Sequence, residues 1–172
     1  MGKTCLDKLM GKVITSCTIP TNGVKDLYLM HAEDVTLGFA SDGSIRTVTF
    51  AAGAKSYKIE GYKQNIQITS AIRTMDASNK VDATVMFKIP TFPTGTGIRL
   101  LGGRFYAMAQ MNNLRNLFVG SISPLECSGY DYDSNTNGGL ITVTLTSPDG
   151  SAGNFLQDTE PAAVNTIISK AV

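Results

Sequence analysis

The sequence contains no tryptophan, only one histidine and only three cysteines among its 172 residues. A Ser-His-Asp or Cys-His arrangement would have to use His31, and no nucleophile-elbow motif lies near it. Cys5, Cys17 and Cys127 have no Cys-x-x-Cys spacing and, with a single histidine, give no recognisable zinc motif. The sequence therefore predicts no catalytic residues, no cofactor and a protein that is not an enzyme, with His31 at the end of a strand.

Neither sign of charge dominates, because 15 lysines and arginines balance 14 aspartates and glutamates for a net charge of +1. This balance argues against a dedicated nucleic-acid binder, which usually carries a basic patch. It also leaves little repulsion between copies of the chain. No run of about 18 apolar residues is present, so we expect no membrane-spanning helix and no membrane partner.

Alternation of apolar and polar residues predicts a mainly β chain. The clearest run is 81–89, where alternate residues are apolar and Pro90 follows. In residues 141–146, apolar residues alternate with threonines. Turn signals that recur about every 8–12 residues indicate a β-sandwich or partly closed barrel with at most one or two short helices. The other predicted elements are strands at 24–30, 44–50, 55–61, 104–111 and 117–119, a hairpin turn at 42–43, a short helix at 4–14, and a short helix or strand at 162–170.

The segment 133–138 matches the opening of a calcium-binding loop, in which oxygen ligands occupy alternate residues before a glycine. The twelfth residue of such a loop is a bidentate glutamate, but here it is Thr144, in the middle of a predicted strand. An Asn/Gly-rich hairpin loop is the simpler interpretation. We therefore expect no metal site. The weak calcium candidates are Asp131, Asp133, Asn135 and Asn137.

Several segments, taken in order, resemble a virion protein pattern found in phages of Bacteroidetes hosts, including the crAss-like phages. The residues that carry the resemblance are 23–29, 33–35, 42–45, 52–53, 57–60, 81–89, 104–120, 129–133 and 138–146. Together they cover about residues 23–150. The first twenty residues, the segment 91–97 and the chain beyond Gly150 depart from the pattern.

The resemblance implies a tail-tube-like β-sandwich or partly closed barrel that works as a structural virion protein. Such a protein assembles with itself into a closed ring or tube in the tail or neck, and sixfold and twelvefold rings both fit. Its partners would be neighbouring tail, neck or portal-vertex proteins, and assembly would take place in the host cytoplasm. DNA would be a non-specific passenger, so we expect polar or acidic residues and few lysines or arginines in the lumen.

We expect residues 1–20 to form an N-terminal extension, 21–150 the β-sandwich or barrel domain, and 151–172 a C-terminal arm. The two ends and the segment 61–80 are the expected joints between rings. A capsid-decorating or carbohydrate-binding β-sandwich module, assisted by calcium at 131–137, is the alternative function. Low aromatic content counts against a sugar platform, for which Tyr130 and Tyr132, expected in a loop, are the candidates.

Overall fold

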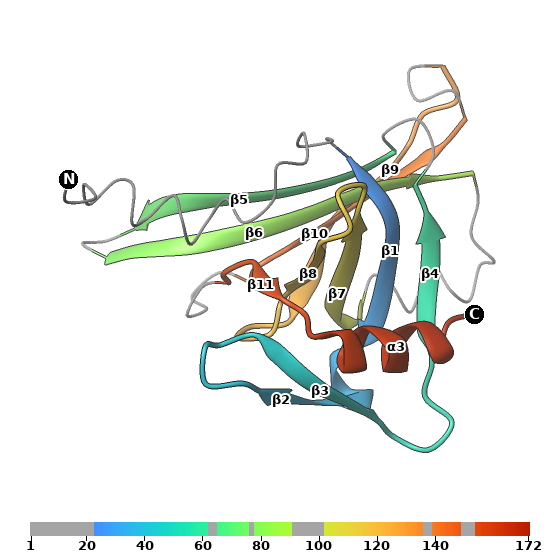
Figure 1. The fold of residues 1–172 in the computed structure, drawn as a ribbon. Helices are drawn as coiled ribbons and strands as arrows, with labels where there is room; N and C mark the ends of the chain where they lie inside the picture. The colour runs from blue at the N-terminus through green and yellow to red at the C-terminus, as the bar shows by residue number, and fades with distance from the viewer. Residues whose placement is uncertain (1–22, 62–64, 76–77, 91–101, 136–138, 149–153) are drawn as a thin grey trace, which may run out of the picture.

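The computed structural model describes residues 23–61, 65–75, 78–90, 102–135, 139–148 and 154–172. Over these ranges the chain is mainly β, as the sequence predicts (Figure 1). None of the helices in the described ranges is long and apolar enough to cross a membrane. The strands are β1 (Val24–His31), β2 (Val35–Phe39), β3 (Ile45–Phe50), β4 (Ser56–Glu60), β5 (Ile66–Met75), β6 (Ser78–Ile89), β7 (Arg104–Met111), β8 (Asn116–Val119), β9 (Leu125–Tyr132), β10 (Ile141–Thr146) and β11 (Gln157–Asp158). The helices are the 3-10 turn η1 (Ala32–Asp34) and α3 (Pro161–Ser169).

Nine strands form one antiparallel sheet that branches at β7. On one side β7 pairs with β1, which pairs in turn with β4. On its other side β7 pairs first with β9, at Arg104 and Phe105, and then with β8, at 107–110. From β9 the sheet continues through β10 and β6 to β5, and from β8 it continues to β11. The strands β2 and β3 form a separate hairpin.

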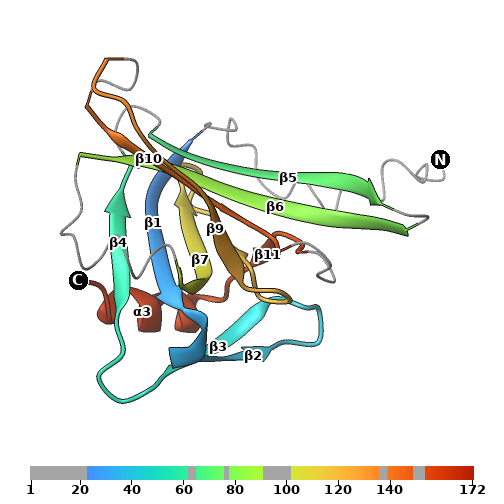
Figure 2. The same cartoon turned by 180° about the vertical axis from the view of Figure 1, so that it is seen from behind.

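The branched sheet encloses one core and covers a second. The first core lies between the β4-β1-β7 branch and the β9-β10-β6-β5 branch, and Val85, Phe87, Val143 and Leu145 are fully buried in it. The second core lies on the opposite face of β1 and β7, where α3 and the β2–β3 hairpin pack. Figures 1 and 2 show the resulting layers, with the long β5–β6 hairpin on one side and α3 with β2–β3 on the other. The fold is sandwich-like and is not a closed barrel.

The predicted strands are confirmed at β1, β3, β4, β6, β7, β8 and β10, and the predicted hairpin turn lies between β2 and β3. In β6 the alternation has the predicted result, because Ala83, Val85 and Phe87 are fully buried. The tail at 161–169 is a helix and not a strand. The expected helix at 4–14 and the segment 91–97 lie outside the described residues.

Two expectations about loops were wrong. Most of the segment 61–80, expected as a long loop, is strand β5 and the start of β6, because Ile66, Ile68 and Ile72 supply a strand face. Its expected role as a joint between rings stays a prediction. Tyr130 and Tyr132, expected in a loop, belong to β9. Residues 133–139 do connect two strands, β9 and β10, as the hairpin interpretation requires.

The described part of the expected C-terminal arm packs against the body. Ala163 and Ile167 of α3 are buried in the second core. The hydroxyl of Ser56 donates a hydrogen bond of 2.7 Å to the carbonyl oxygen of Ile167. Beyond the helix, residues 170–172 run along the outer edge of β4, where backbone hydrogen bonds of 3.0 to 3.2 Å join Ser56 and Lys58 to Lys170 and Val172. This segment therefore covers the β4 edge.

Candidate functional site

The outer edge of β5 is the candidate binding surface of the described chain. In the described chain β5 is hydrogen-bonded to β6 alone, over all ten of its residues. The amide of Lys88 donates a 2.9 Å hydrogen bond to the carbonyl oxygen of Asn65, so the odd-numbered residues direct their backbone groups toward β6. Because backbone direction alternates along an antiparallel strand, the N–H and C=O groups of Ile66, Ile68, Ser70 and Ile72 point to the outer edge.

Half of the β5–β6 hairpin extends past the rest of the sheet. Strand β10 pairs with β6 only from Thr84 to Ile89, so β5 is the only described strand that pairs with residues 78–82 of β6. Figures 1 and 2 show this end of the hairpin projecting away from the body. Ile66 is buried in the first core, whereas Ile72, on the same face of β5, is 72% exposed. Among the described residues, the apolar stripe of the core thus continues onto a projecting surface that no other described strand covers.

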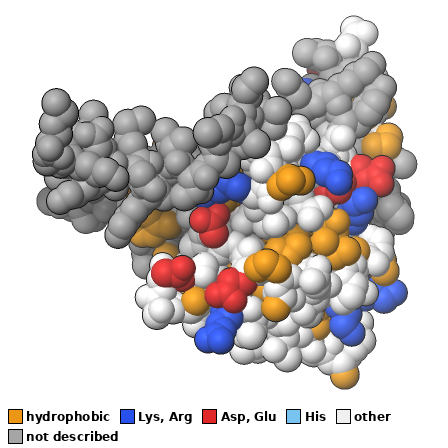
Figure 3. Space-filling model, in the orientation of Figure 1, with side chains coloured by type: hydrophobic (Ala, Val, Ile, Leu, Met, Phe, Trp, Pro, Cys, Tyr) orange, Lys and Arg blue, Asp and Glu red, His pale blue; other side chains and the backbone are white. Residues whose placement is uncertain are grey.

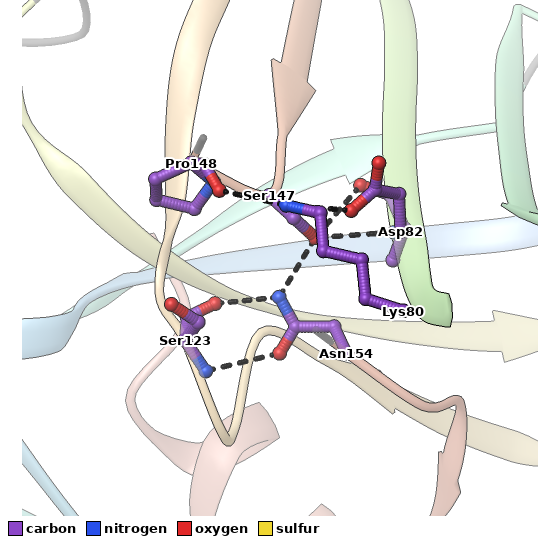
Figure 4. A network of polar contacts seen from close by, with 7 residues as sticks. Lys80, Asp82, Ser123, Ser147, Pro148 and Asn154 are labelled. Carbon is purple, nitrogen blue, oxygen red and sulfur yellow. Dashed lines mark hydrogen bonds and ion pairs between the residues drawn. The ribbon is translucent and has the colours of Figure 1, made fainter. Parts of the chain in front are cut away.

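A cluster of polar side chains fixes the hairpin where it leaves the body (Figure 4). The fully buried Asn154 accepts a hydrogen bond of 3.0 Å from the amide of Ser123. Its side-chain amide donates to the carbonyl oxygen of Ser123 at 2.7 Å and to the hydroxyl of Ser147 at 2.9 Å. The backbone amide of Asn154 donates to the carbonyl oxygen of Val81 at 2.6 Å. The β8–β9 turn, the end of β10 and the hairpin are therefore joined at one residue.

This cluster does not have the chemistry of a nucleophile with a base. The hydroxyl of Ser147 is engaged with Asn154 and with both backbone groups of Ala83. Lys80 forms an ion pair of 3.3 Å with Asp82 and donates to the carbonyl oxygen of Pro148 at 3.4 Å. Since each of these polar groups is held by another part of the fold, the cluster is a structural brace.

The face of β5, β6 and β10 that points away from the first core is rich in threonine. Thr69, Thr84 and Thr146 lie side by side across the three strands. Thr142 and Thr144 continue the same face along β10. Among described side chains, the charged residues that share this face with the threonines include Lys80, Asp82, Lys88, Arg104, Glu126 and Asp131. The surface is mainly neutral and polar, with acidic and basic groups mixed.

His31, Tyr28 and Lys58 are titratable residues whose contacts lie within the fold. His31 ends β1, as predicted, and its ring lies 4.8 Å from that of Phe105 and 6.3 Å from that of Tyr57. Burial raises the pKa of Tyr28, with Asp26 adding to the effect. The hydrogen bond with Glu60 raises the pKa of Lys58. The ion pair of 3.5 Å between Lys58 and Asp26 joins β4 to β1, whereas the pair between Lys58 and Glu60 lies within β4.

The described residues of the weak calcium motif lie at the end of β9 and in the turn that follows it. Asp131 lies in β9 opposite Thr142, and the carboxylate of Asp133 accepts a 2.7 Å hydrogen bond from the amide of Asn135, which closes a turn. Thr144, at the position of the missing glutamate, is held in β10 opposite Met86. The described residues contain no group of three or more His, Cys, Asp or Glu side chains placed to hold a metal ion. Asn137 lies outside the described residues.

Among the described side chains, the face seen in Figure 3 shows no patch of one charge sign. Lysines and arginines lie among aspartates and glutamates, and apolar side chains form a band across the middle of this face. Cys127 is partly buried, and burial raises the pKa of its thiol, so the thiol stays protonated at neutral pH. Neither feature defines a binding or reaction centre.

Sequence reasoning did not find the β5 edge or the Asn154 brace. The signal for β5 was present in Ile66, Ile68 and Ile72, but Ser70 interrupts the apolar stripe. Asn154 lies in an ordinary polar stretch and carries no sequence signal of burial. No protein-family model, no curated protein and no solved structure matches this chain.

Proposed function

We propose that the chain is a structural virion protein that assembles with copies of itself into a ring or tube in a phage tail or neck. The observation that carries this proposal is the outer edge of β5, which projects from the body and pairs on one side only in the described chain. An open edge of this length is a template for another strand. Soluble proteins usually cover or shorten such edges, as residues 170–172 do at β4.

The edge is suited to a contact that propagates. When it joins a different surface of the next copy, the contact is heterologous, and a series of such contacts closes into a ring if the rotation allows. The net charge of +1 leaves little repulsion between neighbours. The Asn154 brace holds the projecting hairpin firmly to the body, which reduces the entropy lost on pairing.

The threonine-rich face gives the ring a surface suited to a DNA channel. We place the face that carries Thr84, Thr144 and Thr146 toward the lumen, where neutral hydroxyls do not grip phosphates as rows of lysine and arginine do. DNA then passes through without specific contacts. The ring partners are copies of this chain and neighbouring tail, neck or portal-vertex proteins, and assembly takes place in the host cytoplasm.

One observation favours a second candidate, a capsid-decorating or carbohydrate-binding module. Tyr130 and Tyr132 are 41% and 60% exposed and point to the same face of β9, because alternate residues of a strand share a face. Exposed aromatic rings side by side suit stacking against a sugar. Only two rings contribute, so this candidate ranks below self-assembly.

The first test is the mass of the purified full chain by light scattering, with negative-stain images of the same sample. We expect rings or short tubes that increase with protein concentration. Ile72→Lys should remove them, because a charged side chain on the edge strand opposes pairing. Leu114→Lys is the matched control, since Leu114 is 86% exposed and lies in the β7–β8 turn, not on β5. Both variants should keep the wild-type melting temperature, as surface substitutions usually do.

Rings in the wild type and in Leu114→Lys, with none in Ile72→Lys, would support the proposal. Wild-type protein that never forms a closed assembly at any concentration would contradict it, as would rings of Ile72→Lys. Glycan binding lost on Tyr130→Ala and Tyr132→Ala would then favour the second candidate.

A further inference from the structure

We infer that the free chain, before it joins a ring, pairs the β5 edges of two copies in antiparallel register across a twofold axis at Ser70. The inference rests on the proposed function only in that the same edge later serves ring assembly. A long open edge in solution attracts any complementary strand, and the strand present at equal concentration is β5 of another copy. A twofold contact requires a self-complementary surface, and β5 has one.

The faces of the sheet limit the registers that are allowed. Even-numbered residues of β5 face the core side and odd-numbered residues face the threonine side, as the burial of Ile66 and the position of Thr69 show. If both copies keep their cores on one side, even residues must oppose even residues. The outward backbone groups also belong to the even residues, so the same registers satisfy the hydrogen bonds.

Among these registers, the one centred on Ser70 uses the strand best. Ser70 then lies opposite Ser70 of the second copy, and Ile68 lies opposite Ile72 twice, once on each side of the axis. Nine residues of each copy, 66–74, take part in the backbone ladder. A twofold axis at residue 68 or 72 would shorten the ladder. An axis at residue 69 would place Ile68 opposite Ser70, and an axis at residue 71 would place Ile72 opposite Ser70, so in both registers an isoleucine would face a serine. Ile72, which is 72% exposed in the single chain, lies beside a partner isoleucine in this register.

The pairing extends the existing sheet without a change of direction. The four-stranded branch β9-β10-β6-β5 of each copy joins its twin into one continuous antiparallel sheet, with both bodies on the same side. The projecting half of each β5 gains a neighbour, and the edge that would otherwise promote uncontrolled association is covered. The β5 edges of the two copies must separate before either copy can enter a ring. The dimer therefore keeps the chain unassembled until another copy or a growing ring displaces the second β5.

The experiment is a cysteine scan across the axis in the full chain, with Cys5, Cys17 and Cys127 replaced by serine. Single variants Thr69→Cys, Ser70→Cys and Ala71→Cys are oxidised and separated on a non-reducing gel. In the Ser70 register, the two Cα atoms of residue 70 lie about 5.5 Å apart, within disulfide reach. Those of residue 69 or 71 are diagonal neighbours about 7–8 Å apart, at or beyond that reach. Thr36→Cys is the control variant. Thr36 is an exposed strand residue on β2, and its cross-linking measures the background from random collisions.

We expect nearly complete dimer for Ser70→Cys and only the Thr36→Cys background for the other two variants. The oxidised dimer should form no rings, and reduction should restore them. No Ser70→Cys dimer above background, faster cross-linking at residue 69 or 71, or rings built from the oxidised dimer would each overturn the inference. A Ser70→Cys dimer in a protein that builds no rings when reduced would leave the inference standing and contradict the proposed function.

Discussion

The side-chain amide of Asn154 donates a 2.9 Å hydrogen bond to the hydroxyl of Ser147, seven residues earlier in the chain. Ser147 in turn accepts a hydrogen bond of 3.1 Å from the amide of Ala83 in β6. Through these two residues, the segment before β11 is connected to the base of the hairpin that carries the candidate assembly edge. The stability of the body and the position of that edge therefore depend on the same buried contacts.

Asn154→Ala should destabilise the fold. The substitution leaves both backbone groups of Ser123 without their side-chain partner in a partly buried place. Groups left unsatisfied in this way cost about 1–3 kcal/mol each, so we expect a loss of about 2–4 kcal/mol. For a chain of this length the melting temperature should fall by roughly 5–15 °C. Calorimetry of Asn154→Ala beside Asn135→Ala, an exposed asparagine, measures the difference. Equal melting temperatures for the two variants would contradict the structural role of Asn154.

Gly61→Ala should also destabilise the fold, for a steric reason. A Cβ atom at residue 61 would overlap the backbone carbonyl oxygens of Val24 and Lys25, and backbone cannot move aside as a side chain can. Gly61 also donates a hydrogen bond of 2.7 Å to Lys25. We expect a loss of about 1–3 kcal/mol, read from the urea midpoint. Gly102→Ala is the control, because nothing lies within 4 Å of its added Cβ. A neutral Gly61→Ala variant would show that β1 and the end of β4 are not in close contact.

The strands were predictable wherever one face of the sheet is buried and the other is not. In β6 and β10 the alternation of Val85 and Phe87, or of Val143 and Leu145, with polar residues follows directly from this environment. In β5 Ser70 interrupts the same alternation between Ile68 and Ile72, so the sequence signal is weaker there than in β6 and β10. Strand β9 was missed because its second half is exposed on both faces and has glycine and aspartate among its residues.

The candidate site was harder to predict than the fold, because an open edge is defined by what does not pair with it. Sequence patterns show which residues face a core, but they do not show the order of strands in a sheet. The position of β5 at the end of the β9-β10-β6-β5 branch depends on pairings between segments far apart in the chain. The burial of Asn154 likewise results from contacts with residues 81, 123 and 147 that no local pattern specifies.

Asp42 should make the fold sensitive to acid at the β2–β3 turn. Hydrogen bonds from the backbone amide and the hydroxyl of Ser44 lower the pKa of the Asp42 carboxyl below its ordinary value of 3.8. A carboxyl with a lowered pKa in the folded state stabilises the fold above the unfolded pKa, and this contribution is lost as the pH falls through the folded pKa. Thermal unfolding of wild type and Asp42→Asn between about pH 6 and pH 2 measures the effect. The wild type should be the more stable above about pH 5, and the difference should disappear toward pH 2. A difference that is constant with pH would rule out this ionisation as its cause.

Lysines placed on the threonine-rich face should convert a channel that releases DNA into one that retains it. Assembled wild-type rings should bind DNA weakly at about 100 mM salt, because Lys80 and Arg104 on the face of Thr84 and Thr144 form ion pairs with Asp82 and Glu126. The double variant Thr84→Lys/Thr144→Lys adds positive charges that face the proposed lumen and should retain DNA in a filter-binding assay. That binding should weaken steeply as salt rises, since each phosphate contact releases counterions.

Thr36→Lys/Thr47→Lys, which adds the same charge to exposed positions of the β2–β3 hairpin, is the matched control and should behave as the wild type. If the control retains DNA as well as the double variant does, overall charge explains the binding and the threonine-rich face does not line the channel. Tight binding by the wild type itself would likewise contradict a lumen that lets DNA slide.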